Sequence, residues 1–324
     1  MLSCVFRFFR ILEVMLLPSW KSQVLLGTLR ANRFWTERIS LGMMHADAPP
    51  DQVARMPMLG TKGTPLSIGN IPAILVNPNQ ITDSSYIILH MHGGAYVSGG
   101  LLQARVLASH IAAASGIKVI TFAYRLAPQY PYPAQLEDAQ AVYAHLLSEG
   151  YDPRRIAFTG ESAGGNLALA LVLKMKADGM QLPAGILLLS PWGDPLQTGE
   201  SYRTLENEDP TLDRETLMTS ALQFAGGDRE LLSTPMLSPI HADFRGFPPV
   251  QIHVGTKELL LSDAETLAAA FKRDEVPVSL LRWEGMCHVF QVFGFQESRL
   301  SIKAAGCFLR QLLISEKAPE TLLC

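Results

Sequence analysis

The sequence has few cysteines and little charge. Its 324 residues include four cysteines, Cys4, Cys287, Cys307 and Cys324, spaced too widely for a metal-binding motif or a disulfide scaffold. This usage predicts a reducing compartment, hence a cytoplasmic location, and no bound metal. The formal net charge is only −3 and no basic stripe is present, which argues against nucleic acid as a partner.

The N-terminal segment is apolar but is interrupted by charge. Residues 1–17 contain Arg7, Arg10 and Glu13, so no uncharged stretch there approaches the roughly 20 residues that span a bilayer. The segment also lacks the small-residue cleavage site of a signal peptide. We expect this segment to form an amphipathic helix that covers an apolar surface. Peripheral contact with a membrane stays an open alternative, because basic residues stand beside aromatic ones.

From about residue 86 the chain alternates apolar strand-like runs with helical patterns. The predicted strands are 86–91, 118–123, 155–159, 185–189, 250–254 and 278–283, and the predicted helices are 101–114, 134–147, 166–173, 262–271 and 298–313. This alternation predicts an α/β fold, with a mainly parallel central sheet covered by helices on both faces. Reactive groups are then expected at the carboxyl ends of the strands. Residues 62–76 are expected to add antiparallel edge strands.

Two stretches break this alternation. Residues 1–45 are helical in pattern but precede any strand, and residues 195–249 are polar, rich in proline and helical in patches such as 214–224. Both are longer than ordinary connections, so we expect them to form a cap over the active edge of the sheet. The predicted organisation is an N-terminal helical cap segment over 1–45 and a catalytic domain over 46–324 with a cap insertion around 195–245.

The pattern Gly160-Glu161-Ser162-Ala163-Gly164 lies between a predicted strand and a predicted helix. In that context a G-x-S-x-G turn is sharp enough to present a serine hydroxyl above the sheet as a nucleophile. Taken alone, the same residues are also compatible with a tight turn and an idle serine. Ser162 is therefore the candidate nucleophile, and the rest of the chain must supply its partners.

A serine nucleophile needs a base, and the base needs an orienting acid. Of eight histidines, only His288 lies in a loop after a late strand, where this fold class places its base. Glu258 lies three residues beyond the strand end at Gly255 and is the favoured acid. Asp263 opens the following helix, where it could serve as a cap or first-turn acid, and it is the alternative.

The oxyanion of an acyl-transfer reaction needs preorganised donors. Gly93 and Gly94 follow a predicted strand, so their amides can turn toward the edge of the sheet, and the Ala163 amide supplies a further donor. The loop lacks the Lys-Ser/Thr of a P-loop and the third glycine of a dinucleotide fingerprint. His92 is expected to anchor the loop.

Six short motifs occur together over residues 70–290: His92-Gly93-Gly94-Ala95, Tyr124-Arg125-Leu126-Ala127-Pro128, Leu136-Glu137-Asp138-Ala139, Gly160 to Gly165, Gly255 to Asp263 and Gly285-Met286-Cys287-His288. In this order they resemble the hormone-sensitive-lipase-like family of α/β-hydrolases, in its bacterial carboxylesterase branch. The resemblance implies an α/β-hydrolase fold with a helical cap, a triad of Ser162, an acid and His288, and no cofactor.

The chain departs from the family pattern at two places. Ala95 stands where the family usually has a third glycine, and the resemblance places its amide in the oxyanion loop with those of Gly93 and Gly94. Glu258 stands where most members carry the aspartate of the triad. Glu161, in the variable position before the serine, is expected to be structural.

The predicted function is a serine carboxylesterase acting on short- to medium-chain acyl esters through an acyl-serine intermediate. The expected partner is a small acyl ester. An amidase or peptide hydrolase with the same triad is an open alternative, because fold and triad do not separate esters from amides. A non-catalytic ligand-binding receptor on the same fold is the other alternative, and a homodimer is an open alternative to a monomer.

Overall fold

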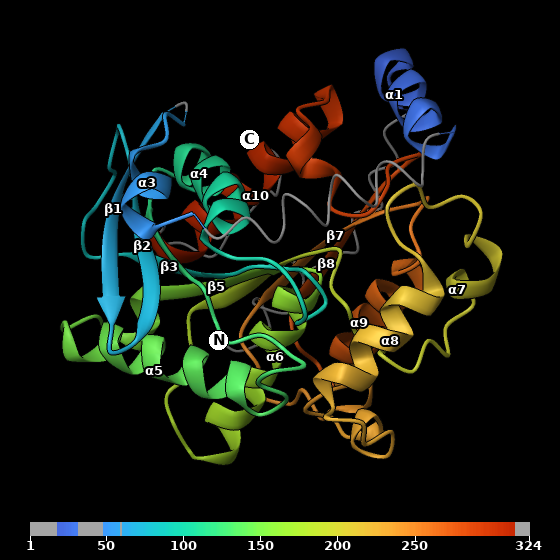
Figure 1. Cartoon of the computed structure of the whole chain (residues 1–324). Helices are drawn as coiled ribbons and strands as arrows, with labels where there is room; N and C mark the ends of the chain where they lie inside the picture. The colour runs from blue at the N-terminus through green and yellow to red at the C-terminus, as the bar shows by residue number, and fades with distance from the viewer. Residues whose placement is uncertain (1–17, 32–47, 59, 315–324) are drawn as a thin grey trace, which may run out of the picture.

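The computed structural model describes residues 18–31, 48–58 and 60–314. Its centre is an eight-stranded sheet in the order β1-β2-β4-β3-β5-β6-β7-β8 (Figure 1). The strands are β1 (Thr61–Ile68), β2 (Ile71–Pro78), β3 (Ile87–Met91), β4 (Lys118–Phe122), β5 (Ile156–Glu161), β6 (Gly185–Leu189), β7 (Val250–Gly255) and β8 (Val278–Trp283). β1 and β2 are antiparallel edge strands, and the other pairs, from β4 to β8, are parallel. The expected α/β fold with a mainly parallel sheet is confirmed.

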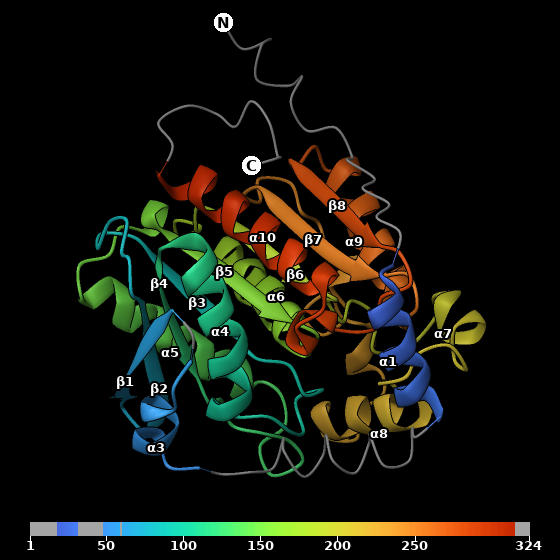
Figure 2. The same ribbon diagram turned by 90° about the horizontal axis from the view of Figure 1, so that it is seen from above.

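Helices cover both faces of this sheet. On one face lie α3 (Pro50–Arg55), α4 (Leu101–Ser115) and α10 (Gln296–Ile314), and on the other lie α5 (Ala134–Ser148), α6 (Ala163–Ala177) and α9 (Leu261–Arg273) (Figures 1 and 2). Alternate residues of one strand enter the two cores: Ile88 of β3 packs on the α4 side and Leu89 on the α6 side. Each such fully buried side chain contributes on the order of 2 kcal/mol. Because the strands are covered on both faces, they read as continuous apolar runs in the sequence.

The register of the parallel strands places their carboxyl ends at one edge. Met91 pairs with Gly160, Glu161 with Leu189, and Gly255 with Trp283. The loops that follow β3, β5, β6, β7 and β8 therefore begin side by side. These loops carry the candidate residues that the sequence singled out.

The boundaries of the predicted elements lie within two residues of the observed ones, except that the helix predicted at 166–173 is the longer α6, Ala163–Ala177. The strands predicted at 185–189 and 278–283 and the helix predicted at 214–224 have the predicted bounds. β5 continues to Glu161, beyond the predicted end at residue 159, because Gly160 and Glu161 still pair with β6.

The segment between β6 and β7 contains two α-helices, α7 (Ser201–Thr204) and α8 (Arg214–Phe224), and two short 3-10 helices. We call residues 195–245 the insertion. Two buried side chains connect it to the core around the sheet: Asn166 Nδ2 donates to the Leu237 carbonyl at 2.8 Å, and the Tyr202 hydroxyl donates to Asp263 Oδ2 at 2.9 Å.

Within the predicted N-terminal segment 1–45, the structure describes residues 18–31, which form α1 (Trp20–Ala31). The Ser19 amide donates to the Glu297 carboxylate at the start of α10, and Leu26 packs in a cluster with Met286 and Phe290. The apolar residues 1–17 lie outside the described residues. No helix in the described part of the chain is both long and apolar enough to cross a membrane.

Candidate active site

Ser162 lies at the turn from β5 into α6, in a strained backbone conformation with φ 56° and ψ −123°. The two flanking glycines are needed there for space. A Cβ on Gly160 would lie 2.2 Å from the Gly164 carbonyl oxygen, and a Cβ on Gly164 would lie 2.0 Å from the Met91 carbonyl oxygen. The Ser162 amide donates to the Leu189 carbonyl at 3.0 Å, which fixes the turn against the end of β6. The sharp strand-to-helix turn expected from the sequence is present.

His288 and Glu258 meet at the carboxyl edge of the sheet. His288 Nδ1 lies 3.3 Å from Glu258 Oε1, at the long end of hydrogen-bond distances. Glu258 is fully buried and His288 is nearly so, with 10% of its side chain exposed. Burial raises the pKa of Glu258, and the hydrogen bond with His288 opposes that shift. The geometry lets the carboxylate orient the imidazole, as an orienting acid must.

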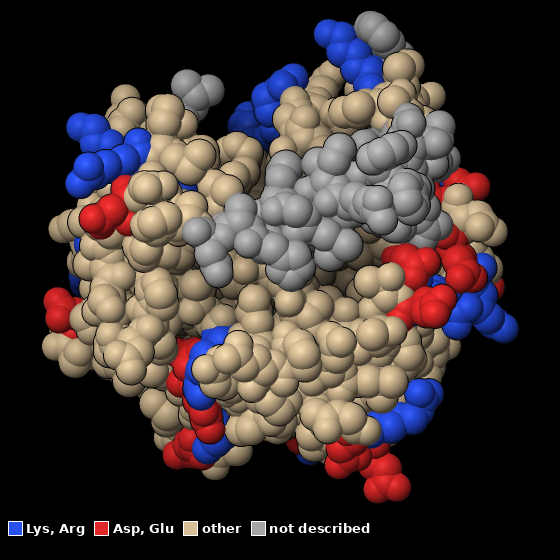
Figure 3. Space-filling view, in the orientation of Figure 1, with Lys and Arg blue, Asp and Glu red and all other residues tan. Residues whose placement is uncertain are grey.

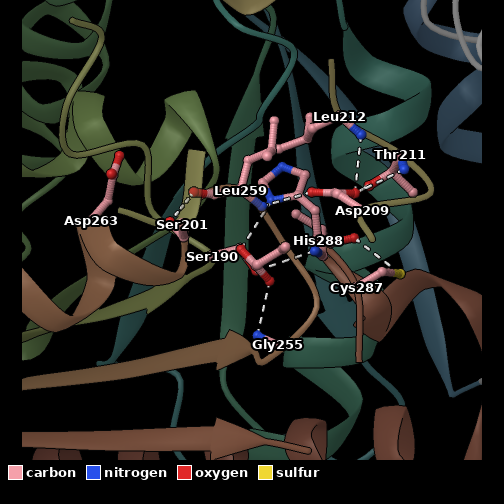
Figure 4. A network of polar contacts seen from close by, with 12 residues as sticks. Ser190, Ser201, Asp209, Thr211, Leu212, Gly255, Leu259, Asp263, Cys287 and His288 are labelled. Atoms are coloured by element: carbon pink, nitrogen blue, oxygen red, sulfur yellow. Dashed lines mark hydrogen bonds and ion pairs between the residues drawn. The ribbon is translucent and has the colours of Figure 1, made fainter. Parts of the chain in front are cut away.

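Ser190, which no sequence pattern singled out, connects these groups. Its hydroxyl donates to Glu258 Oε2 at 2.8 Å and accepts from the Val289 amide at 3.2 Å. Glu258 Oε2 also accepts the Gly255 amide at 2.8 Å. Since Ser190 directly follows β6, it can contact both the acid and the chain next to His288. Figure 4 shows Ser190 near His288. Its position at a strand end beside the elbow was the only sequence signal for it.

Asp263, the alternative acid, belongs to a different set of contacts. Its Oδ2 accepts the amides of Gly193 and Asp194, both at 2.9 Å, and the Tyr202 hydroxyl. Figure 4 shows it apart from His288. Burial raises the pKa of Asp263 well above its usual range. Its contacts hold the chain after β6 and the insertion in place.

The loop after β3 corrects one sequence-based expectation, the role of Gly93. The Gly93 amide donates to Glu161 Oε1 at 2.7 Å, so it is engaged by a side chain and is not available to an oxyanion. Among the described residues, the amides of Gly94, Ala95 and Ala163 have no hydrogen-bond acceptor. Ala95 has φ 52°, a conformation that its Cβ permits at a modest cost.

The loop after β3 is held from several sides. His92 Nδ1 lies 2.7 Å from the Gly93 carbonyl oxygen, and the ring stacks on Tyr124, as an anchoring role requires. The Tyr96 hydroxyl donates to Asn166 Oδ1 at 2.8 Å, and its ring stacks on Phe224 of the insertion. The loop is thus bound to the elbow helix and to the insertion at once.

Beneath the loop, Glu161 and His90 form a buried pair. Glu161 Oε2 lies 3.3 Å from His90 Nε2, without the alignment of a hydrogen bond. Burial raises the pKa of Glu161 to about 8 and lowers the pKa of His90 to about 3. Because Glu161 holds the Gly93 amide and precedes Ser162, its role here is structural, as expected.

Backbone strain is concentrated around these residues. Several residues other than glycine have a positive φ, and those near the site are Ala95, Tyr96, Ser162, Ser190 and Val289. Such conformations cost about 1–3 kcal/mol each and are typical of functional sites. A positive φ is especially unfavourable for a β-branched residue such as Val289.

No set of three or more His, Cys, Asp or Glu side chains in the described ranges is arranged to hold a metal ion. The site combines a serine at a strained elbow, an acid–histidine pair at the same edge of the sheet, and three amides that have no acceptor among the described residues. This arrangement suits acyl transfer to a serine hydroxyl.

Comparison with known proteins agrees with this geometry. A family profile described as alpha/beta hydrolase fold matches residues 88–292. An acetyl-hydrolase of Streptomyces hygroscopicus is 35% identical over 250 residues, which are 76% of this chain and 82% of that protein. An esterase of Acinetobacter venetianus is 34% identical over 231 residues, 71% of this chain and 76% of that protein.

Solved structures give the same result. A mutant of the esterase E40 superposes with a TM-score of 0.82 at 35% identity, covering 92% of this chain and 100% of that chain. An esterase from the bacterial hormone-sensitive lipase family superposes with a TM-score of 0.80 at 34% identity, with 92% and 100% coverage. The chain therefore belongs to the α/β-hydrolase fold family and, within it, to the bacterial hormone-sensitive-lipase group of carboxylic ester hydrolases.

Proposed function

We propose that this protein is a serine carboxylesterase that hydrolyses small acyl esters of short to medium chain length through an acyl-serine intermediate. The observation that carries the proposal is the contact of 3.3 Å between His288 Nδ1 and Glu258 Oε1 at the edge of the sheet that also presents Ser162. The names of the acetyl-hydrolase and esterase relatives support an ester substrate.

In the proposed reaction, the Ser162 hydroxyl attacks the ester carbonyl carbon while His288 takes its proton. His288 then returns the proton to the leaving alkoxide, and the acyl group stays on Ser162. A water molecule, deprotonated by His288, then attacks the acyl-serine. The bond from the acyl carbon to Ser162 Oγ breaks, His288 gives its proton to Oγ, and the carboxylic acid is released. Glu258 keeps the imidazole in one tautomer and stabilises the imidazolium that forms in each step.

The amides of Gly94, Ala95 and Ala163 are the proposed oxyanion donors. These N–H groups can donate hydrogen bonds to the developing oxyanion without reorganisation, because the loop and the elbow already fix their positions. Each donor would contribute about 3 kcal/mol of transition-state stabilisation. Gly93 takes a supporting role, because its amide secures the loop to Glu161.

We further propose that the N-terminal segment and the insertion together cap the pocket above this edge. The stacking of Tyr96 on Phe224 supports this, because it connects the proposed oxyanion loop to α8 of the insertion. The cysteine usage supports a cytoplasmic location.

Ser162→Ala, Glu258→Gln and Asp263→Asn, assayed with 4-nitrophenyl acetate and butyrate, test the assignment. We expect Ser162→Ala and Glu258→Gln to lower kcat by at least about 10³-fold, as for other serine triads. Asp263→Asn keeps an oxygen acceptor for its donors, so the folded variant should retain kcat within about threefold. A crippled Asp263→Asn beside an active Glu258→Gln would reverse the acid assignment, and near wild-type turnover by Ser162→Ala would refute the proposed function.

A further inference from the structure

The insertion touches the loop that carries the proposed acid. This loop, residues 256–260 between β7 and α9 (Leu261–Arg273), is here called the acid loop. The amide of Leu259, the residue directly after Glu258, donates to Asp209 Oδ2 at 2.9 Å. Both Leu259 and Asp209 are buried, so water cannot replace this hydrogen bond. Figure 4 shows the two residues next to His288.

The other oxygen of Asp209 organises its own segment of the insertion. Oδ1 accepts the amide and the hydroxyl of Thr211, each at 2.8 Å, and the Leu212 amide at 3.1 Å. The carboxylate therefore divides its acceptor capacity between the insertion and the acid loop. These local hydrogen bonds fix the orientation of the Asp209 side chain, so that Oδ2 is held toward the acid loop.

Two further contacts join the same segments. The Lys257 ammonium lies 3.1 Å from Glu208 Oε2, in an exposed ion pair that is expected to be weak. The Ser201 hydroxyl donates to the Leu259 carbonyl. Leu259 is thus held by the insertion through both its amide and its carbonyl. The carboxylate of the preceding residue, Glu258, contacts Ser190 and His288.

The charges are consistent with this proximity. Burial is the main cause that raises the pKa of Glu258, and the negative charge of Asp209 raises it further. The two carboxylates lie close enough to interact, although each is fixed by its own donors.

We infer that Asp209 is a positioning residue for the Glu258–His288 pair: a side chain of the insertion that fixes the acid loop through the Leu259 amide. The inference rests on the proposed function and deepens it. If it holds, the insertion helps to position the proposed acid as well as capping the edge of the sheet. An acid loop released from Asp209 would let Glu258 shift relative to His288, and a displacement of about 1 Å at such a site can cost on the order of 100-fold in rate.

The substitution Asp209→Asn tests this with little disturbance of the insertion. The three donors at Oδ1 favour placing the amide oxygen there, so the amide nitrogen faces the Leu259 N–H and that hydrogen bond is lost. We expect kcat for 4-nitrophenyl butyrate to fall by about 10- to 100-fold, with KM changed less than about twofold because Ser162 and the proposed oxyanion donors are untouched. Asp228→Asn is the matched control: Asp228 accepts the Glu230 and Leu231 amides within the insertion, and an asparagine oxygen can do the same.

A double-mutant cycle separates positioning from a general structural effect. If Asp209 acts through Glu258, Asp209→Asn should lower kcat by less than about twofold in the Glu258→Gln background. Thr211→Val is the milder second variant if Asp209→Asn does not fold. It removes one donor to Oδ1, and we expect a loss of about two- to fivefold in kcat that also disappears in Glu258→Gln.

The inference is overturned if Asp209→Asn retains wild-type kcat, or if its loss is undiminished in Glu258→Gln. In either case a crippled Glu258→Gln single variant leaves the proposed function standing. Wild-type activity of Glu258→Gln would instead remove the proposed function, and the inference with it.

Discussion

Glu161 supports the site with a single buried carboxylate. It accepts the Gly93 amide at 2.7 Å, and it directly precedes the strained Ser162. Its second oxygen faces the ring of His90. An acid so placed is costly to ionise, because a buried charge loses its hydration. The residue that holds the loop is therefore also a source of pH-dependent stability.

We predict that Glu161→Gln changes the pH dependence of stability. The folded protein keeps the Glu161 proton up to a pKa of about 8, whereas the ordinary value is 4.5. The unfolded chain therefore binds fewer protons between these two pH values, and wild-type stability falls as pH rises through this window. Glutamine does not titrate, so the variant does not lose this stability. Its free energy of unfolding relative to that of the wild type should rise by a few kcal/mol between pH 4.5 and 8 and stay constant above pH 8.

Urea unfolding of both proteins at about pH 5, 7 and 8.5 measures this difference. Burial and the charge of His92 lower the pKa of His90 to about 3, which is below the whole window, so His90 stays neutral in both folded proteins and affects the two stability curves alike. Parallel stability curves across the window would contradict the prediction and would mean that Glu161 is already ionised in the folded protein.

At the residue scale, the sequence singles out the proposed reactive groups more readily than the groups that hold them. Ser162, Glu258 and His288 could be found because an elbow, a strand end and a late loop mark their places in the chain. Ser190 and Asp209 could not, since a lone serine or aspartate gains its role only from the register that brings it to the acid loop. Gly93 was assigned wrongly because no pattern shows that the Glu161 side chain turns back toward its amide.

At the scale of elements, the elbow depends on close approach between two backbones. We predict that Gly164→Ala prevents the turn from forming, because the new Cβ would lie 2.0 Å from the Met91 carbonyl oxygen of β3. Neither backbone can move without breaking the pairing of β3 with β5. The expected loss is more than about 3 kcal/mol of stability, with little soluble active protein.

Gly100→Ala provides the matched control for this prediction. Gly100 precedes α4 and has an extended φ of 161°, and a Cβ added to it would meet no atom within 4 Å. Its replacement should change the melting temperature and esterase activity very little. Equal thermal stability of the two variants would show that the elbow has room for a side chain.

The elements themselves could be predicted because the buried parallel strands and the helices differ in length and pattern. The run 185–189 shows this, since all five residues are apolar and all five are buried. The path of the insertion could not be predicted in the same way. Its polar segments are placed by single hydrogen bonds such as that from Asn166 to the Leu237 carbonyl, and such bonds leave no periodic pattern.

At the scale of the whole molecule, the face shown in Figure 3 carries Lys, Arg, Asp and Glu side chains mainly around its periphery, with both signs mixed. Neither sign forms a continuous field across the described surface of this face. The buried contacts of Tyr202 and Leu26 hold the insertion and α1 to the core, and salt screens buried contacts much less than it screens exposed charges.

Helix α1 joins the N-terminal part of the chain to the loop of His288. Leu26 is 4% exposed and packs in the cluster that contains Met286 and Phe290, on either side of His288 in the sequence. Leu26→Ala should loosen this packing, and a buried leucine truncation typically costs about 2–5 kcal/mol. Because α1 lies at the surface, the loss should appear as local undocking rather than as global unfolding.

We expect Leu26→Ala to speed proteolysis within residues 18–31 by about tenfold or more and to lower kcat by at least about threefold, because the His288 loop loses part of its support. Val24→Ala is the control on the same helix, since Val24 is 61% exposed and should change neither quantity. Faster proteolysis of Leu26→Ala with undiminished kcat would separate the two effects. The His288 loop would then keep its geometry through the core alone, by contacts such as the Lys257 amide to the Met286 carbonyl at 2.9 Å, and α1 would serve only as a cover.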